Sequence, residues 1–279
     1  VARTGQHDVF AIDLAWEVAI DSEDRIVACG SKGENWGPLD MAVARYYGAA
    51  PWNGSTASVC VADEVAYVAE SGSSGGKLIA IDVSNPTSPV ILTEESTPHP
   101  LFDLDGVRDI AVQGDIAFVV AKEYGNLDIL DVSDPSSPGL LAALGDGGDG
   151  FNQLGGAWSV AVSGTTAYVA ALGDNALTTI NVTDPSSPVK LAEVVDGSGG
   201  FNHLAGARDV FVDGDTAYVT ATNDDALTII DVSNPASPVL LAELVDGSGG
   251  YTKLGGAREV FVRDGIAYVT ADEDDALTM

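Results

Sequence analysis

The sequence predicts an all-β fold, a β-propeller of four-stranded antiparallel blades. The last four-fifths of the chain repeats with a period of fifty residues, and periods of 20–50 residues mark solenoids, propellers or arrays. Each unit holds four short apolar runs rich in Val, Ile, Tyr, Phe and Thr, which are too short for helices. Turn residues separate the runs, so each unit is one antiparallel meander, the blade of a propeller.

The unit at residues 201–250 illustrates the pattern. We expect its strands, called a to d, at residues 208–212, 216–220, 226–232 and 238–244. Short turns with Asp, Asn and Gly join the first three, and a bend with two prolines joins strands c and d. Because turns alternate between the two ends of a blade, the d-to-a and b-to-c loops should share one face.

The central residue of strand a gives the blade count. It recurs six times, at Val18, Val59, Ile110, Val160, Val210 and Val260. We therefore expect one propeller domain over residues 1–279 with six visible blades, or seven if the chain is a fragment. Their expected spans are 15–56, 57–106, 107–156, 157–206, 207–256 and 257–279. The last blade stops in strand c, and the N-terminal segment, residues 9–14 or 1–8, would complete it.

The repeat resembles a known family. The phrases LTIIDVSNPASPVLLAEL, LDILDVSDPSSP and LIAIDVSNPTSPVIL, each after a strand of AYV type, are similar to LVIVD-repeat β-propellers. The resemblance covers about residues 57–279 and implies the propeller fold. It also implies large secreted or surface-attached proteins of bacteria and archaea, and it supplies no catalytic motif.

The composition is strongly acidic, with 42 Asp and Glu against 12 Lys and Arg and a net charge of −30. This charge excludes nucleic acid, whose binding needs a basic face, and disfavours anionic membrane surfaces. Two explanations stay open, a salt-rich habitat and a calcium-rich exterior where carboxylates are ligands. No apolar run is long enough for a transmembrane helix.

The expected location is extracellular or at the cell surface. No signal peptide is present, so a secreted chain would have lost it, and both termini are expected to be processed or cut. Expected partners are an extracellular protein, a carbohydrate or further copies of the chain.

Cysteines and histidines are few. Cys29 and Cys60 fall in adjacent blades, where either a disulfide or two buried thiols is compatible with the pattern. The three histidines, at unrelated points of the repeat, are His7, His99 and His203. A zinc site or a Ser-His-Asp triad is therefore not expected.

The entry to strand a is the best candidate ligand site. Round the ring, that position holds two tryptophans, one alanine and three arginines: Trp16, Ala57, Arg108, Trp158, Arg208 and Arg258. Arginine forks bind carboxylates or phosphates, and tryptophan stacks on sugars or cations. The position after it holds Glu17, Ser58, Asp109, Ser159, Asp209 and Glu259. The alternative is that each arginine pairs with its acidic neighbour and plugs the channel.

A second candidate site is acidic. Gly-rich loops on the same face offer carboxylates and carbonyls of the kind that Ca²⁺ binds. The candidate ligands are Asp146, Asp149, Asp174, Asp196, Asp224, Asp225, Asp246 and Asp274. Calcium is the one cofactor considered, and the loops do not match an EF-hand. The alternative is that these residues cap turns.

Other recurrent residues are expected to be structural. The loop aromatics Phe151, Phe201 and Tyr251 should plug the space between blades, and Tyr168, Tyr218 and Tyr268 should pack there. The residues before the proline bends should accept turn amides; these are Asp82, Asp131, Asn181 and Asp231.

The sequence thus favours a non-enzymatic extracellular repeat protein that acts in binding or assembly. The alternative is a Ca²⁺-dependent hydrolase or lyase with its site at the mouth of the channel. A bound ion on the axis would favour the enzyme, and a plug of arginine–carboxylate pairs would favour the scaffold.

Overall fold

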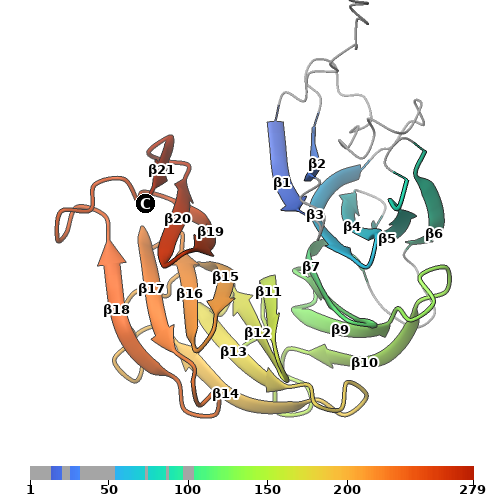
Figure 1. Cartoon of the computed structure of the whole chain (residues 1–279). Coiled ribbons are helices and arrows are strands. Elements are labelled where there is room, and N and C mark those ends of the chain that lie inside the picture. The colour runs from blue at the N-terminus through green and yellow to red at the C-terminus, as the bar shows by residue number, and fades with distance from the viewer. Residues whose placement is uncertain (1–13, 21–25, 32–53, 73–74, 86–87, 97–103) are drawn as a thin grey trace, which may run out of the picture.

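The computed structural model describes residues 14–20, 26–31, 54–72, 75–85, 88–96 and 104–279, with side chains from residue 57 onward. All of its regular elements are strands, and they form successive antiparallel meanders. Figure 1 shows that the sheets follow one another round an arc. Within the described residues, no helix is long and apolar enough to span a membrane.

Four sheets are complete blades of four strands each. The first contains β3 (Gly54–Ala62), β4 (Val65–Gly72), β5 (Gly75–Asp82) and β6 (Val90–Ser96). The second contains β7 (Val107–Gln113), β8 (Ile116–Ala121), β9 (Asn126–Asp131) and β10 (Gly139–Gly145). The third contains β11 (Ala157–Ser163), β12 (Thr166–Ala171), β13 (Ala176–Asn181) and β14 (Val189–Val195). The fourth contains β15 (Ala207–Asp213), β16 (Thr216–Ala221), β17 (Ala226–Asp231) and β18 (Val239–Val245).

Two sheets are smaller. The sheet at the C-terminal end contains β19 (Ala257–Arg263), β20 (Ile266–Ala271) and β21 (Ala276–Thr278). The sheet that precedes β3 in the chain is a pair, β1 (Leu14–Ile20) and β2 (Ile26–Ser31). The described chain therefore has five blades, the fifth with three strands, and the predicted count of six is wrong. The physical reason lies in residues 32–53, whose sequence lacks the apolar strand c and the proline bend of the repeat.

The completion of the last blade by the N-terminal segment stays a prediction. Residues 1–8 and 9–13 lie outside the described part, and Leu14 pairs with Ser31 of β2. The last sheet has an uncovered face among the described residues. Leu277 is 60% exposed there, whereas the residues at its position in the complete blades are buried: Leu127, Leu177 and Leu227.

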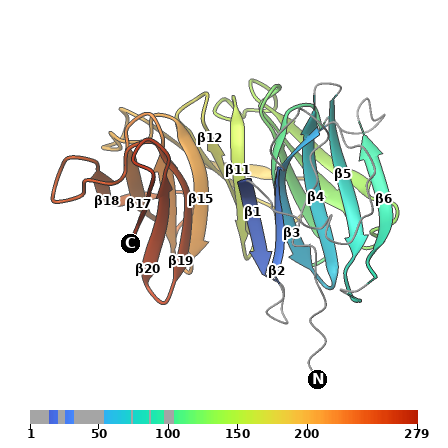
Figure 2. The same cartoon turned by 90° about the horizontal axis from the view of Figure 1, so that it is seen from above.

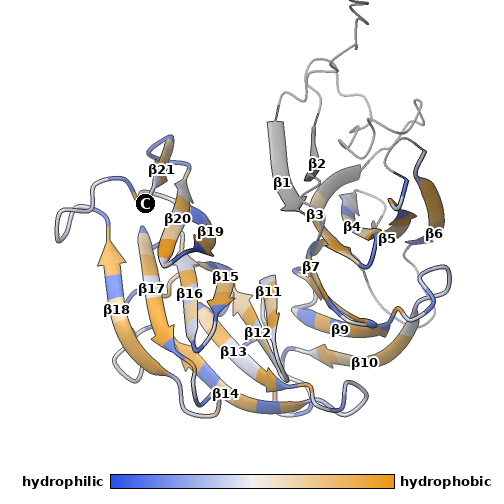
Figure 3. Cartoon of the chain, in the orientation of Figure 1, coloured by the Kyte–Doolittle hydropathy of each residue, from blue (hydrophilic) through white to orange (hydrophobic). Residues whose placement is uncertain are grey.

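The blades pack face to face round an inner ring. The first strands β7, β11, β15 and β19 lie on the inner side of the arc, and β10, β14 and β18 lie on its outer side. Figure 2 shows the same sheets standing side by side. Side chains from neighbouring blades form the core between them: Tyr168 of β12 packs with Phe201 and Leu204, which lead into β15. Figure 3 shows the apolar strands and the hydrophilic turns that produce this packing.

The turns confirm the expected chemistry. Glycine at positive φ closes the a-to-b hairpins, as at Gly164 (φ 58°) and Gly214 (φ 57°), because a side chain is strained in this region. At the c-to-d bends, each side-chain oxygen before the proline accepts the amide two residues on, at 2.9 Å; these residues are Asp82, Asp131, Asn181 and Asp231. These are Asx turns.

Candidate functional site

The entry to each first strand carries a β-bulge. The pairing with the second strand breaks between Val107 and Asp109, and again between Ala157 and Ser159. Equivalent breaks occur in the other first strands. The residues omitted from regular pairing include the six ring positions that the sequence singled out: Trp16, Ala57, Arg108, Trp158, Arg208 and Arg258. In the last blade Glu259 is omitted as well. A bulge redirects a side chain away from the sheet's alternation.

A glycine fixes the entry to the strand. Gly206 adopts φ +70°, and a Cβ atom there would lie 2.9 Å from the backbone nitrogen of Asn223 in the b-to-c turn. The amide of Gly206 donates to the Asn175 side chain of the preceding blade at 2.7 Å. These contacts hold the strand entry close to the b-to-c turn and orient the bulge two residues later.

Trp158 gathers three cationic side chains. The guanidinium carbon of Arg108 lies 4.5 Å from the centre of the indole, and that of Arg208 lies 4.6 Å from it. The two arginines come from the blades on either side of Trp158. The ammonium nitrogen of Lys122, in a b-to-c turn, lies 5.3 Å from the ring. All three distances are within the range of cation–π attraction, and we call these four residues the arginine–tryptophan site.

Arg258 is engaged differently. One terminal nitrogen of Arg258 makes an ion pair with Asp272, which occupies in the last blade the turn position that Lys122 occupies in the second. The Nε atoms of Arg108 and Arg258 are buried without a hydrogen-bond partner among the described residues. Trp16 lies in β1, of which only the backbone is described. The structure therefore brings together three of the five predicted ligand-binding residues, Arg108, Trp158 and Arg208.

The carboxylates beside the ring join neighbouring blades. Asp109 accepts the Ser58 hydroxyl of the preceding blade at 2.7 Å, the amide of Ile110 at 2.8 Å, and the amide of Val160 in the following blade at 2.9 Å. Asp109 thus links three blades by its two oxygens.

Asp209 repeats this arrangement. It accepts the Ser159 hydroxyl at 2.7 Å and the amides of Val210 and Val260 at 2.9 and 2.8 Å. Arg208 and Asp209 form no ion pair within the described residues, although the charges of Glu259, Asp272 and Asp209 all act on Arg208. Two amides and a serine hydroxyl donate to the carboxylate of Asp209, and the guanidinium of Arg208 lies over the indole of Trp158.

Burial shifts the pKa values of the ring. Loss of hydration raises the pKa of Asp209 to about 6, and the charge of Asp109 adds to this, whereas the hydrogen bonds from Val260 and Ser159 oppose it. Burial lowers the pKa of Arg108, and it lowers the pKa of Arg208 together with repulsion from Arg258. Removing a charged group from water disfavours its charged form.

The acidic loops bind backbone amides. Asp146 accepts the amide of Leu154 at 3.2 Å, and Asp174 accepts that of Gly155 at 2.6 Å. The equivalent residues in later blades, which accept equivalent amides, are Asp196, Asp224, Asp246 and Asp274. Asp225 accepts the amide of Gly256, and Asp149 holds a positive φ of 51° in its turn.

These contacts give the loops a structural role. Burial and the neighbouring Asp146 charge raise the pKa of Asp174, so this pair does lie close together. Among the residues that the structure describes, no group of three or more His, Cys, Asp or Glu side chains is arranged to hold a metal. Calcium binding stays a prediction.

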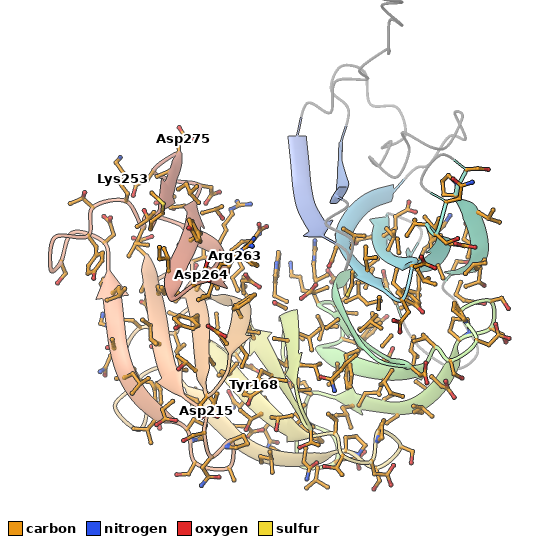
Figure 4. All side chains as sticks on the ribbon, in the orientation of Figure 1. Tyr168, Asp215, Lys253, Arg263, Asp264 and Asp275 are labelled. Atoms are coloured by element: carbon orange, nitrogen blue, oxygen red, sulfur yellow. The ribbon has the colours of Figure 1, made fainter. Side chains whose placement is uncertain are left out.

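The recurrent aromatics are mostly core. Phe151 is 2% exposed and Phe201 is 6% exposed, each in a cluster formed with neighbouring strands. Their expected role between blades is confirmed, whereas Tyr251 is exposed. Tyr168 lies near Asp215 (Figure 4), and burial raises its pKa.

Of the cysteine and histidine side chains, the structure describes those of Cys60 and His203. Cys60 is half-buried in β3, and Cys29 lies in β2, whose side chains are outside the described part. The predicted alternatives for this pair stay open. His203 contacts Glu243 at 2.9 Å, and His7 and His99 lie outside the described residues.

Two groups of functional interest escaped the sequence interpretation. Lys122 and Asp272 come from b-to-c turns, and only their shared place in the repeat indicates that they face the ring. The inter-blade role of Asp109 and Asp209 was also missed. Its available signal was the alternation of Ser and Asp at the position after the bulge, Ser58, Asp109, Ser159 and Asp209.

Solved structures share the fold at low sequence identity. The periplasmic gluconolactonase PpgL of Pseudomonas aeruginosa is 14% identical with a TM-score of 0.68, over 94% of this chain and 79% of that one. The hydrazine synthase of Kuenenia stuttgartiensis is 14% identical with a TM-score of 0.63, over 95% and 82%. A putative 6-phosphogluconolactonase from Bacteroides uniformis is 13% identical with a TM-score of 0.62, over 89% and 71%. These similarities show the fold alone.

A family model matches more than half of the chain. It is described as the LVIVD repeat, and it matches residues 53–96, 106–144, 154–196 and 206–245. These spans correspond to the four complete blades. No curated protein is similar enough in sequence to count as a relative. The repeat model and the blades agree, and the chain belongs to the LVIVD repeat family.

Proposed function

We propose that this chain is a non-enzymatic binding or assembly scaffold that acts outside the cell or at its surface, with its ligand site at the mouth of the propeller channel. The observation that carries the proposal is the convergence of Arg108, Trp158 and Arg208 from three successive blades. All three stand at bulges, which recur beside functional sites because they redirect side chains.

The surrounding contacts support binding rather than catalysis. Asp109 and Asp209, the carboxylates beside the site, hold backbone amides and serine hydroxyls, so both serve to join blades. The repeated sheets form a rigid frame, and rigid frames suit sites that bind without rearrangement. A net charge of −30 suits a solvated surface outside the cell, where the candidate partners are carbohydrate, protein or further copies of the chain.

A Ca²⁺-dependent hydrolase or lyase is the second candidate, and one observation favours it. Asp209 lies at the channel mouth with its pKa raised to about 6, and perturbed carboxylates cluster at catalytic sites. Two fold neighbours are a gluconolactonase and a putative 6-phosphogluconolactonase. Their identity to this chain is too low to transfer an activity.

A paired experiment separates the two candidates. Binding is measured on an array of neutral, acidic and basic glycans, and self-association by sedimentation velocity, for the wild type, Arg208→Ala and Arg263→Ala. Arg263 is exposed at the end of β19, away from the strand entry. Its replacement removes the same charge as Arg208→Ala at a position outside the ring. The proposal predicts binding that Arg208→Ala weakens and Arg263→Ala preserves.

Turnover is tested on the same samples with glucono-δ-lactone, with and without Ca²⁺. We expect no hydrolysis above the spontaneous rate. Hydrolysis that is lost in Asp209→Asn would reject the non-enzymatic role and favour the second candidate.

A further inference from the structure

We propose that the arginine–tryptophan site, formed by Arg108, Lys122, Trp158 and Arg208, binds a small oxyanion that carries two or more negative charges on phosphoryl or carboxylate groups. The inference rests on the proposed binding function and names the chemistry of its ligand. Its basis is a group of three cations gathered round one indole in a protein of net charge −30.

The first argument is charge. Three cationic groups lie 4.5, 4.6 and 5.3 Å from one indole centre, and the charge of Arg258 also repels Arg208. Asp109 and Asp209 are occupied by amides and hydroxyls, and Glu123, whose charge acts on Arg108, is exposed. Within the described residues, Arg108, Lys122 and Arg208 make no ion pair, and the charges of Glu259, Asp272 and Asp209 attract Arg208 without forming one. An anion of two or three charges would be attracted by all three cations at once.

The second argument is a free donor. The Nε atom of Arg108 is buried and makes no hydrogen bond within the described part of the chain. A buried donor without an acceptor is costly, and protein structures rarely leave one so. A guanidinium presents its donors in a fork that matches the oxygens of a carboxylate or phosphate, so an oxyanion is the ligand class that this group fits.

The third argument is contrast within the ring. In the last blade, the turn position of Lys122 is occupied by Asp272, which pairs with Arg258. That blade therefore neutralises its own arginine. The second blade places a lysine at the same position and increases the positive charge there instead.

The fourth argument concerns Trp158. Guanidinium groups from both flanking blades already lie over its indole, so stacking on a sugar would displace one of them. The tryptophan instead orients the two arginines, since cation–π attraction holds a guanidinium over the ring without using its hydrogen-bond donors. We expect Trp158 to position the site and the three cations to bind the anion.

The test uses pyrophosphate and citrate as probes, measured by isothermal titration calorimetry on the whole chain at low ionic strength, with acetate and matched NaCl as controls. Arg208→Gln and Lys122→Gln are the variants, and Arg263→Gln is the control of equal charge change. Lys122 is half-buried in a turn, so its variant stays informative if Arg208→Gln fails to fold. Circular dichroism checks folding in each case.

We expect saturable binding of pyrophosphate or citrate by the wild type and by Arg263→Gln. Affinity should fall about tenfold in Arg208→Gln and Lys122→Gln, because each loses a charge-assisted contact, and added salt should weaken binding. Binding of pyrophosphate alone identifies a phosphoryl ligand, and binding of citrate alone identifies a carboxylate ligand. Equal affinity in all variants, or no binding of either probe, would overturn the inference.

Failure of the inference and failure of the proposed function give different results. If a neutral glycan binds the wild type, is lost in Arg208→Ala, and neither anion binds, the binding role stands and the anionic ligand is wrong. If the anions bind and the protein also hydrolyses glucono-δ-lactone, the anion site stands and the non-enzymatic role is wrong.

Discussion

Asp109 offers a sharp test of how the blades are held together. Its two carboxylate oxygens accept a serine hydroxyl from the preceding blade, the amide of Ile110 in its own strand, and the amide of Val160 in the following blade. The replacement Asp109→Ala removes both acceptor oxygens and all three hydrogen bonds at once. It should therefore destabilise the protein without altering any apolar contact of the core.

The expected magnitude follows from the donors left behind. Ile110 and Val160 are 4% and 5% exposed, so water reaches neither amide readily. Each buried amide left without an acceptor lowers the free energy of unfolding by about 1–3 kcal/mol. The Ser58 hydroxyl can rotate toward another acceptor. We expect Asp109→Ala to lower the free energy of unfolding by about 3–5 kcal/mol. Asp109→Asn keeps one acceptor oxygen, so its loss should be about half as large.

The measurement is urea unfolding followed by circular dichroism, with linear extrapolation to water. Asp115→Ala is the matched control, because Asp115 is exposed in the a-to-b turn of the same blade. Its unfolding free energy should stay within about 0.5 kcal/mol of the wild type. A loss below about 1 kcal/mol in Asp109→Ala would refute the role of this residue in joining blades.

Three further predictions concern the ring and the loops. Arg208→Ala should lower the unfolding free energy by about 0.5–2 kcal/mol, the range of a cation–π contact; a loss of about 3–5 kcal/mol, typical of a broken buried ion pair, would restore the channel-plug interpretation. Because the folded-state pKa of Asp209 is raised to about 6 from an ordinary value near 3.9, the folded protein retains a proton there that the unfolded chain releases. The contribution of this proton to the free energy of unfolding is thus fully present below about pH 4. It is lost as the pH rises to about 6, which lowers the free energy of unfolding by about 3 kcal/mol. Urea unfolding of the wild type and Asp209→Asn should diverge over this interval, and parallel pH profiles would contradict the shift. If the Asp-Gly loops bind calcium, millimolar Ca²⁺ should raise the melting temperature relative to EDTA by mass action, whereas identical melting curves would reject calcium.

The sequence predicts the fold well because the repeat reports the same structure several times. The alternation of Val, Ile and Tyr in residues 208–212 and 216–220 specifies strands with one buried face, and the Asp-Gly and Ser-Asn-Pro turns specify the connections. The count of blades was less predictable. A degenerate unit retains two apolar runs, which form β1 and β2, and two strands do not make a complete blade.

The candidate site was predictable in place and not in detail. Repetition aligns Arg108, Trp158 and Arg208 at one position, which brings them to one end of the inner strands. Periodicity cannot report that this position is a β-bulge, because a bulge is a shift of register between strands. Periodicity also does not indicate which side chain each arginine contacts. Arg258 pairs with Asp272 while Arg208 stacks on Trp158, and this difference depends on turn residues from another part of the repeat.

The most direct test of the account is an NMR titration of the tryptophan indole N–H signals. The chain has four tryptophans, and the spectrum of Trp158→Phe identifies the signal of Trp158. If the channel mouth is an anion-binding site, pyrophosphate or citrate should shift the Trp158 signal saturably, whereas acetate and matched NaCl should not. A Trp158 signal that does not move with either probe, or that moves no more than it does with acetate and matched NaCl, would contradict the account.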